Sequence, residues 1–182
     1  MINVEELLTE LTGLTRQHIQ TVQSFKQLPQ EILNRKPVAG GWSILECMEH
    51  LNRYGDFYIP EIEFRIQNSK HRPSAVFKPG LLGDYFAKSM LPKERLNKMK
   101  TFKSMDPADS TLDPSVLDKF IHQQEQILQL LEASRQTNLT RVKTSISISK
   151  WIKLRLGDTL RVVIYHNLRH VVQGQKLVPQ NI

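Results

Sequence analysis

The sequence predicts an all-α protein, a four-helix bundle with a long excursion between its second and third helices. Two observations predict this class: four segments carry apolar residues at helical spacing, and few residues alternate as strands do. At 182 residues and 21.1 kDa the chain fits one domain, residues 1–182. A core of that size needs neither disulfides nor a structural metal to fold.

The helical pattern divides the chain into ordered pieces. A first helix is expected over residues 4–28, where Pro29 ends it, and a third over 114–138. Residues 71–113 lose the period and contain four prolines, so we interpret them as an excursion with short helical pieces that covers a site. Residues 142–156 alternate and are rich in β-branched side chains, which favours a short extended segment before a fourth helix over 158–176.

The second helix has the clearest start. Ser43 followed by Glu46 three residues later forms the pattern of a capping box, in which each side chain bonds the backbone N–H of the other residue. Trp42 precedes the cap and is placed to pack onto Cys47 one turn later. We expect this helix to fade near Asn68.

Composition limits where the protein acts. No stretch approaches the roughly 18 uninterrupted apolar residues that span a bilayer. The first 14 residues carry three glutamates and no basic segment, so they do not have the pattern of a secretory signal. Cys47 is the single cysteine, which excludes an intramolecular disulfide and a cysteine-rich zinc cage. We expect a soluble, cytoplasmic protein whose metal ligands, if any, are histidines or carboxylates.

The formal net charge of +7 raises the question of a nucleic-acid partner. Basic residues gather in segments 93–103 and 143–161, outside the strongest helical patterns. Neither segment has aromatic residues spaced to stack on bases. We therefore expect no specific nucleic-acid binding and no membrane partner.

Three histidines form the most informative group. His166 and His170 lie one helical turn apart, so both imidazoles project from the same face of the fourth helix, at the margin of its apolar arc. His50 occupies the matching margin of the second helix. Two facing helices thus offer three imidazoles to one end of the bundle. Taken alone, an i,i+4 histidine pair is more often a partly buried polar patch than a metal site.

Two segments, GGWSILECMEHLNRY (40–54) and LGDTLRVVIYHNLRHVVQ (156–173), resemble the motif helices of the DinB-like superfamily of four-helix bundles. They carry its patterns WS-x-x-E-x-x-x-H and H-x-x-R-H-x-x-Q, and the connector LPQEILNRKP (28–37) is similar as well. The resemblance implies a DinB-like fold over most of the chain. It also implies that His50, His166 and His170 form a metal triad.

Three neutral imidazoles suit Zn²⁺ or Ni²⁺ and tolerate Fe²⁺ or Mn²⁺, and three protein ligands leave a position open. The resemblance implies that the protein acts on small molecules, either as a thiol-dependent S-transferase or isomerase or as a metal hydrolase. Our first hypothesis is therefore an enzyme that uses the metal to activate a low-molecular-weight thiol or water. The alternatives are a non-catalytic metal-binding or stress-associated interaction protein, possible as a homodimer, and, third, a nucleic-acid binder.

Other polar residues admit two interpretations each. His18 lies within the apolar stripe of the first helix, where a histidine bonded to a backbone carbonyl is the first interpretation and a lining of the metal cavity the second. Gln173, one turn beyond His170, either orients a ligand or is solvated. Tyr54 and Tyr58 either donate hydrogen bonds to a substrate oxyanion or serve as core aromatics. We assign no role to the remaining histidines, His71 and His122.

Overall fold

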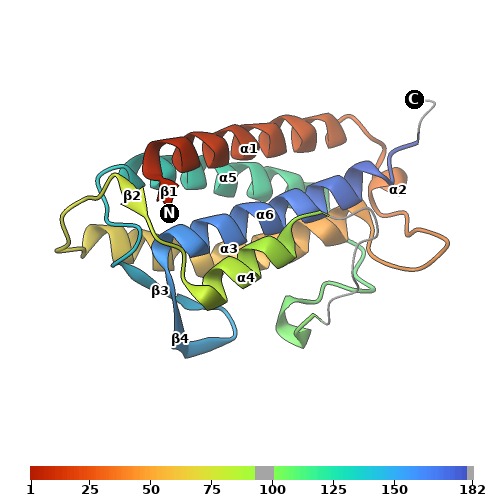
Figure 1. Ribbon diagram of the computed structural model, residues 1–182. Helices are drawn as coiled ribbons and strands as arrows, with labels where there is room; N and C mark the ends of the chain where they lie inside the picture. The colour runs from red at the N-terminus through yellow and green to blue at the C-terminus, as the bar shows by residue number, and fades with distance from the viewer. Residues whose placement is uncertain (93–100, 180–182) are drawn as a thin grey trace.

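Four long helices, α1, α3, α5 and α6, form the body of the molecule (Figure 1). The computed structural model describes residues 1–92 and 101–179. The elements in chain order are β1 (Ile2–Asn3), α1 (Val4–Phe25), α2 (Gln30–Leu33), α3 (Ile44–Gln67), β2 (Val76–Phe77), α4 (Leu81–Met90), the 3₁₀ turn η1 (Lys103–Met105), α5 (Ser115–Ser134), β3 (Lys143–Ile146), β4 (Ser149–Arg155) and α6 (Leu156–Gln175).

The long helices pack in a closed ring of neighbours. Helices α1 and α3 each contact both α5 and α6, so α1 and α3 occupy opposite corners of the bundle. Helix α4 packs alongside α6, next to the four long helices (Figure 1). The mostly helical bundle confirms the predicted fold class.

Local sequence signals fix the helix ends. The Ser43 hydroxyl accepts a hydrogen bond from the Glu46 N–H at 3.1 Å, and the Glu46 carboxylate accepts one from the Ser43 N–H at 2.8 Å, which confirms the capping box. Helix α1 ends at Phe25, three residues before the predicted end. It ends there because the chain tightens into a turn, in which the Leu28 N–H donates to the Phe25 carbonyl before Pro29.

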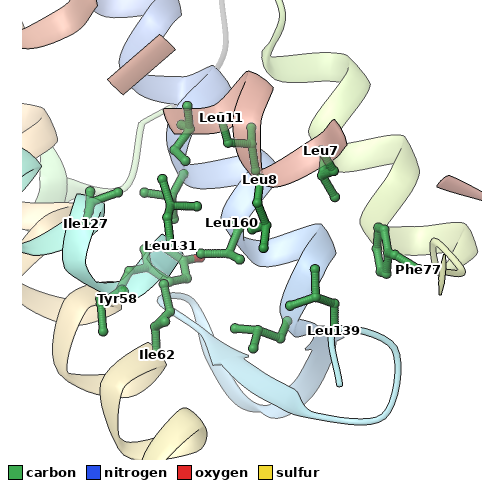
Figure 2. Packing of buried hydrophobic residues seen from close by; sticks show 14 of the residues in the cluster. Leu7, Leu8, Leu11, Tyr58, Ile62, Phe77, Ile127, Leu131, Leu139 and Leu160 are labelled. Carbon is green, nitrogen blue, oxygen red and sulfur yellow. The ribbon is translucent and has the colours of Figure 1, made fainter. Parts of the chain in front are cut away.

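The core divides into two apolar clusters along the bundle. Figure 2 shows residues of the first cluster, which gathers around Leu8, Leu11, Tyr58, Leu131 and Leu160. The second cluster contains Phe25, Met48 and Phe120. Along α3, Leu51 belongs to the second cluster and Tyr54 packs on the first, so the clusters meet beside His50. A polar group at this junction is held between two dry regions.

The excursion is anchored to the bundle. Strand β2 pairs antiparallel with β1 at the N-terminus, and α4 docks on α6. The Gly80 N–H donates to the Asp158 carboxylate at 2.8 Å, and Asp84 pairs with Arg161 at 2.8 Å. Helix α4 confirms the short helical piece predicted in this region. Residues 93–100, which hold most of the basic segment 93–103, lie outside the described residues.

The segment before α6 forms a two-stranded hairpin, which confirms the predicted extended piece. A 2.6 Å hydrogen bond between the Thr144 and Thr159 hydroxyls joins β3 to α6. The Ser145 N–H donates to the Glu61 carboxylate at 2.7 Å, which joins β3 to α3. The hairpin is therefore fixed against two helices of the bundle. Within residues 1–92 and 101–179, no helix combines the length and apolar character needed to cross a membrane.

Candidate metal centre

The three predicted histidines converge on one point. His50 lies in the second turn of α3, and His166 and His170 lie one turn apart on α6, which packs against α3. Their ligand atoms all lie within 4.8 Å of one another, and the Nε2 atoms of His50 and His166 are 3.2 Å apart. The structure therefore brings together all three residues that the sequence singled out.

Two of the imidazoles are oriented through their second nitrogen. Nδ1 of His50 lies 2.7 Å from the Met105 carbonyl oxygen, which can only accept, so Nδ1 carries the proton and donates it. Nδ1 of His170 lies 3.0 Å from Oε1 of Gln173 and donates in the same way. In both rings the Nε2 lone pair is left for a ligand. Such outer partners fix tautomer and ring orientation in metal sites.

Burial keeps the imidazoles neutral. Desolvation lowers the pKa of His50 to about 4 and that of His170 to about 3. Desolvation and the neighbouring imidazoles hold the pKa of His166 well below its ordinary value of 6.5. Near neutral pH all three rings are therefore uncharged, as metal ligation requires.

Aromatic rings enclose the triad. The Trp42 ring packs against His50 at 4.5 Å between centroids and against His170 at 5.5 Å. The Tyr54 ring contacts His50 and His166, each at 4.9 Å. Trp42 also packs on the core cluster that contains Cys47.

The turn before Trp42 uses two glycines, Gly40 and Gly41, with φ of 78° and 124°. That left-handed backbone costs glycine little.

The donor set fits a divalent ion. Ideal tetrahedral zinc geometry separates two nitrogen ligands by about 3.3 Å, close to the 3.2 Å between the Nε2 atoms of His50 and His166. Among the described residues, no cysteine or carboxylate joins the three histidines as a fourth ligand. Cys47 is fully buried, and desolvation raises the pKa of its thiol, so it serves packing. The cluster thus has the composition of an open site rather than a closed structural one.

A cavity of about 880 Å³ opens on the triad. Its walls come from α3, α4, α5, α6, the β3–β4 hairpin, the 39–42 turn and residues 101–106 of the excursion. The volume lies within the usual range for small-molecule sites, about 300–1,000 Å³. The excursion does lie over the site, as its sequence predicts.

A sequence profile of the DinB superfamily matches residues 13–173, a span that includes both histidine segments. The chain belongs to the DinB superfamily. Searches among curated proteins and among solved structures each returned no match. Membership in the DinB superfamily confirms the resemblance and, with the geometry above, shows a three-histidine cluster that can hold a metal ion.

The other histidines lie away from this DinB site. His71 and His122 are exposed, and neither lines the cavity. His18 is 1% exposed, and neither of its ring nitrogens has a hydrogen-bond partner among the described residues. The expected bond to a backbone carbonyl is therefore wrong, because burial holds the ring where neither nitrogen meets an acceptor or donor in the described part of the chain. His18 is also not among the residues that line the cavity.

Several site residues were missed by the sequence interpretation. Met105 contributes only its carbonyl oxygen, which no side-chain pattern can reveal. Asp106 lines the cavity from the aperiodic excursion. Gln124 on α5 and Asn167 on α6 also line it and bond each other at 2.9 Å. Arg169, within the family pattern itself, could have been identified from its place between the two α6 histidines.

Proposed function

We propose that this DinB protein is a divalent-metal-dependent enzyme in which His50, His166 and His170 hold the ion. The observation that carries the proposal is the convergence of three neutral imidazoles within 4.8 Å at the wall of an 880 Å³ cavity. Zn²⁺ or Ni²⁺ suits such ligands best, and Fe²⁺ or Mn²⁺ is also compatible. When bound, the ion would supply Lewis acidity that lowers the pKa of a thiol or water at the open position.

The residues around the triad support a catalytic role for the metal rather than metal storage. The Met105 carbonyl and the Gln173 amide hold two imidazoles in one orientation, which maintains the ligand geometry while substrates exchange. Tyr54 and Tyr58 line the same cavity, and burial raises the pKa of both phenols. Both hydroxyls therefore stay protonated, and that of Tyr54, whose ring contacts His50 and His166, can donate a hydrogen bond to an oxyanion that develops on the substrate.

A low-molecular-weight thiol is our first choice of nucleophile. A hydrolase usually has a carboxylate beside the nucleophilic water as general base. Helix α6 has one carboxylate, Asp158, and it lies at the opposite end of the helix from His170. Asp158 accepts a hydrogen bond from the Gly80 N–H. A thiol that becomes a thiolate on coordination needs no such base. The expected reaction is attack of the thiol sulfur on an electrophilic carbon, which forms a C–S bond as the leaving group departs with its bonding electron pair and the thiol proton goes to solvent.

One observation favours a metal hydrolase as the second candidate. Asp106 lines the cavity, and its negative charge acts on His50. A carboxylate in that position can accept a proton from water during hydrolysis. The variant Asp106→Asn separates the two reactions, because it removes the base that hydrolysis needs and leaves thiol transfer largely intact. Asp109→Asn, an exposed carboxylate in the same segment, is the matched control.

The experiment is an assay of metal-loaded protein with bacillithiol, glutathione and cysteine against an alkylating electrophile, beside ester and amide substrates. We expect metal-dependent turnover that requires the thiol and is lost in His166→Ala. His122→Ala, an exposed histidine, should keep full activity. Hydrolysis without thiol dependence would replace the transferase with the hydrolase. Silence in every assay would favour a non-catalytic metal-binding or interaction protein.

A further inference from the structure

The cavity extends well beyond the triad. It follows α3 from His50 to Tyr58 and α6 from His170 back to Val162, eight residues in each case. At 1.5 Å per residue this is a run of about 12 Å between two packed helices. A metal ion and its immediate ligands occupy only one end of such a length. The remainder is a separate region, which we call the distal chamber.

The distal chamber has apolar walls from three elements. Helix α4 contributes Phe86, and α6 contributes Val162. The hairpin contributes Ile146 and Leu154, which are both buried. The nearby Tyr58 hydroxyl accepts a weak 3.4 Å hydrogen bond from the Ser147 N–H. These walls are therefore mostly apolar, and the Tyr58 hydroxyl still has its proton to donate to a ligand.

Charge is confined to the other end. Among the described residues that line the cavity, Asp106 and Arg169 are the ones with a formal charge. The charge of Asp106 acts on His50, and that of Arg169 acts on His166 and His170, so both sit beside the triad. As the described residues line it, the cavity has one charged, metal-binding end and one end that is uncharged and mostly apolar.

The walls of the distal chamber are fixed to the bundle. A Cβ atom at Gly83 would lie 2.4 Å from the Asp158 side chain, so glycine there lets α4 approach α6 closely. The Asp84–Arg161 ion pair holds the same contact. On the other side, the Thr144–Thr159 and Ser145–Glu61 hydrogen bonds hold the hairpin. The apolar space is therefore preformed.

We propose that the substrate of this site carries an uncharged, extended alkyl or aryl group that fills the distal chamber, with its polar reacting group at the triad. Only the placement of the reacting group at the triad rests on the proposed function. Each methylene transferred from water into the chamber contributes to binding, which gives about a fourfold fall in Kd per methylene. The gain stops when the chamber is full.

The test uses n-alkyl hydroxamates from acetohydroxamate to decanohydroxamate, titrated by calorimetry into zinc-loaded and metal-free protein below their micelle concentrations. We expect Kd to fall by about fourfold per methylene over the middle of the series and then to level off. Phe86→Ala and Phe86→Glu should flatten this dependence while acetohydroxamate binding is unchanged. Tyr85→Ala and Leu82→Glu, at exposed positions of the same helix, should keep it. Thermal melts confirm that the variants fold.

The outcomes separate the two proposals. An affinity that does not change with chain length would contradict the proposal, as would a chain-length dependence that survives in both Phe86→Ala and Phe86→Glu. Failure of acetohydroxamate to bind zinc-loaded protein would count against the metal site. In that case, chain-length-dependent binding by metal-free protein would still support the distal chamber.

Discussion

Replacing His18 by leucine should remove part of the loss of stability on acidification. His18 is 1% exposed, and desolvation lowers its pKa from 6.5 to about 4. The unfolded chain therefore binds the proton more tightly than the folded chain, so the folded state loses stability as pH falls below about 6.5. The loss is complete below the folded pKa and corresponds to about 3 kcal/mol. Around pH 5 it is about 2 kcal/mol.

The assay is urea unfolding of chelator-treated wild type and His18→Leu at about pH 7.5 and about pH 5. The triad histidines titrate equally in both proteins, so the difference between the two pH dependences isolates His18. We expect wild type to lose about 2 kcal/mol more than the variant. His122→Leu, at an exposed position, should behave as wild type. An identical pH dependence in wild type and His18→Leu would refute the reasoning.

The remaining predictions concern single contacts of the structure and the binding of DNA. Gln173→Leu removes the partner of His170 Nδ1 and should weaken zinc affinity by about 10- to 100-fold in competition with a chelating dye, with the melting curve unchanged. Gly83→Ala places a Cβ against Asp158 and should lower the free energy of unfolding by about 1–3 kcal/mol. Gly13→Ala, with open space around its Cβ, should raise it by up to about 1 kcal/mol. Fluorescence anisotropy with duplex DNA should show only weak, non-specific binding at physiological salt, and submicromolar sequence-selective binding would contradict this.

Most of the fold could be predicted because its signals are local. The capping box at Ser43 and Glu46 fixes the start of α3, and the apolar stripes fix the faces of the long helices. The docking of α4 on α6 could not be predicted in the same way. It depends on Gly83, Asp84 and Arg161, whose contacts span about 77 positions and follow no sequence period.

The candidate site likewise combines residues that the sequence reveals with residues that only the structure reveals. His166 and His170 share a helix face by spacing alone, and the family pattern adds His50 from another helix. The Met105 carbonyl and Asp106 come from an aperiodic segment, so their place beside His50 is visible only in three dimensions. His18 was misinterpreted because buried polar rings usually find a partner. The described structure provides none for it.

The most direct test of the central claim is the metal content of protein purified without chelator. Elemental analysis of wild type should find about one divalent ion per chain, and His166→Ala should contain at least about tenfold less while it keeps its helical circular dichroism. His122→Ala should match wild type, since that side chain is exposed and outside the cluster. Equal metal content in wild type and a folded His166→Ala would contradict the assignment of the metal centre.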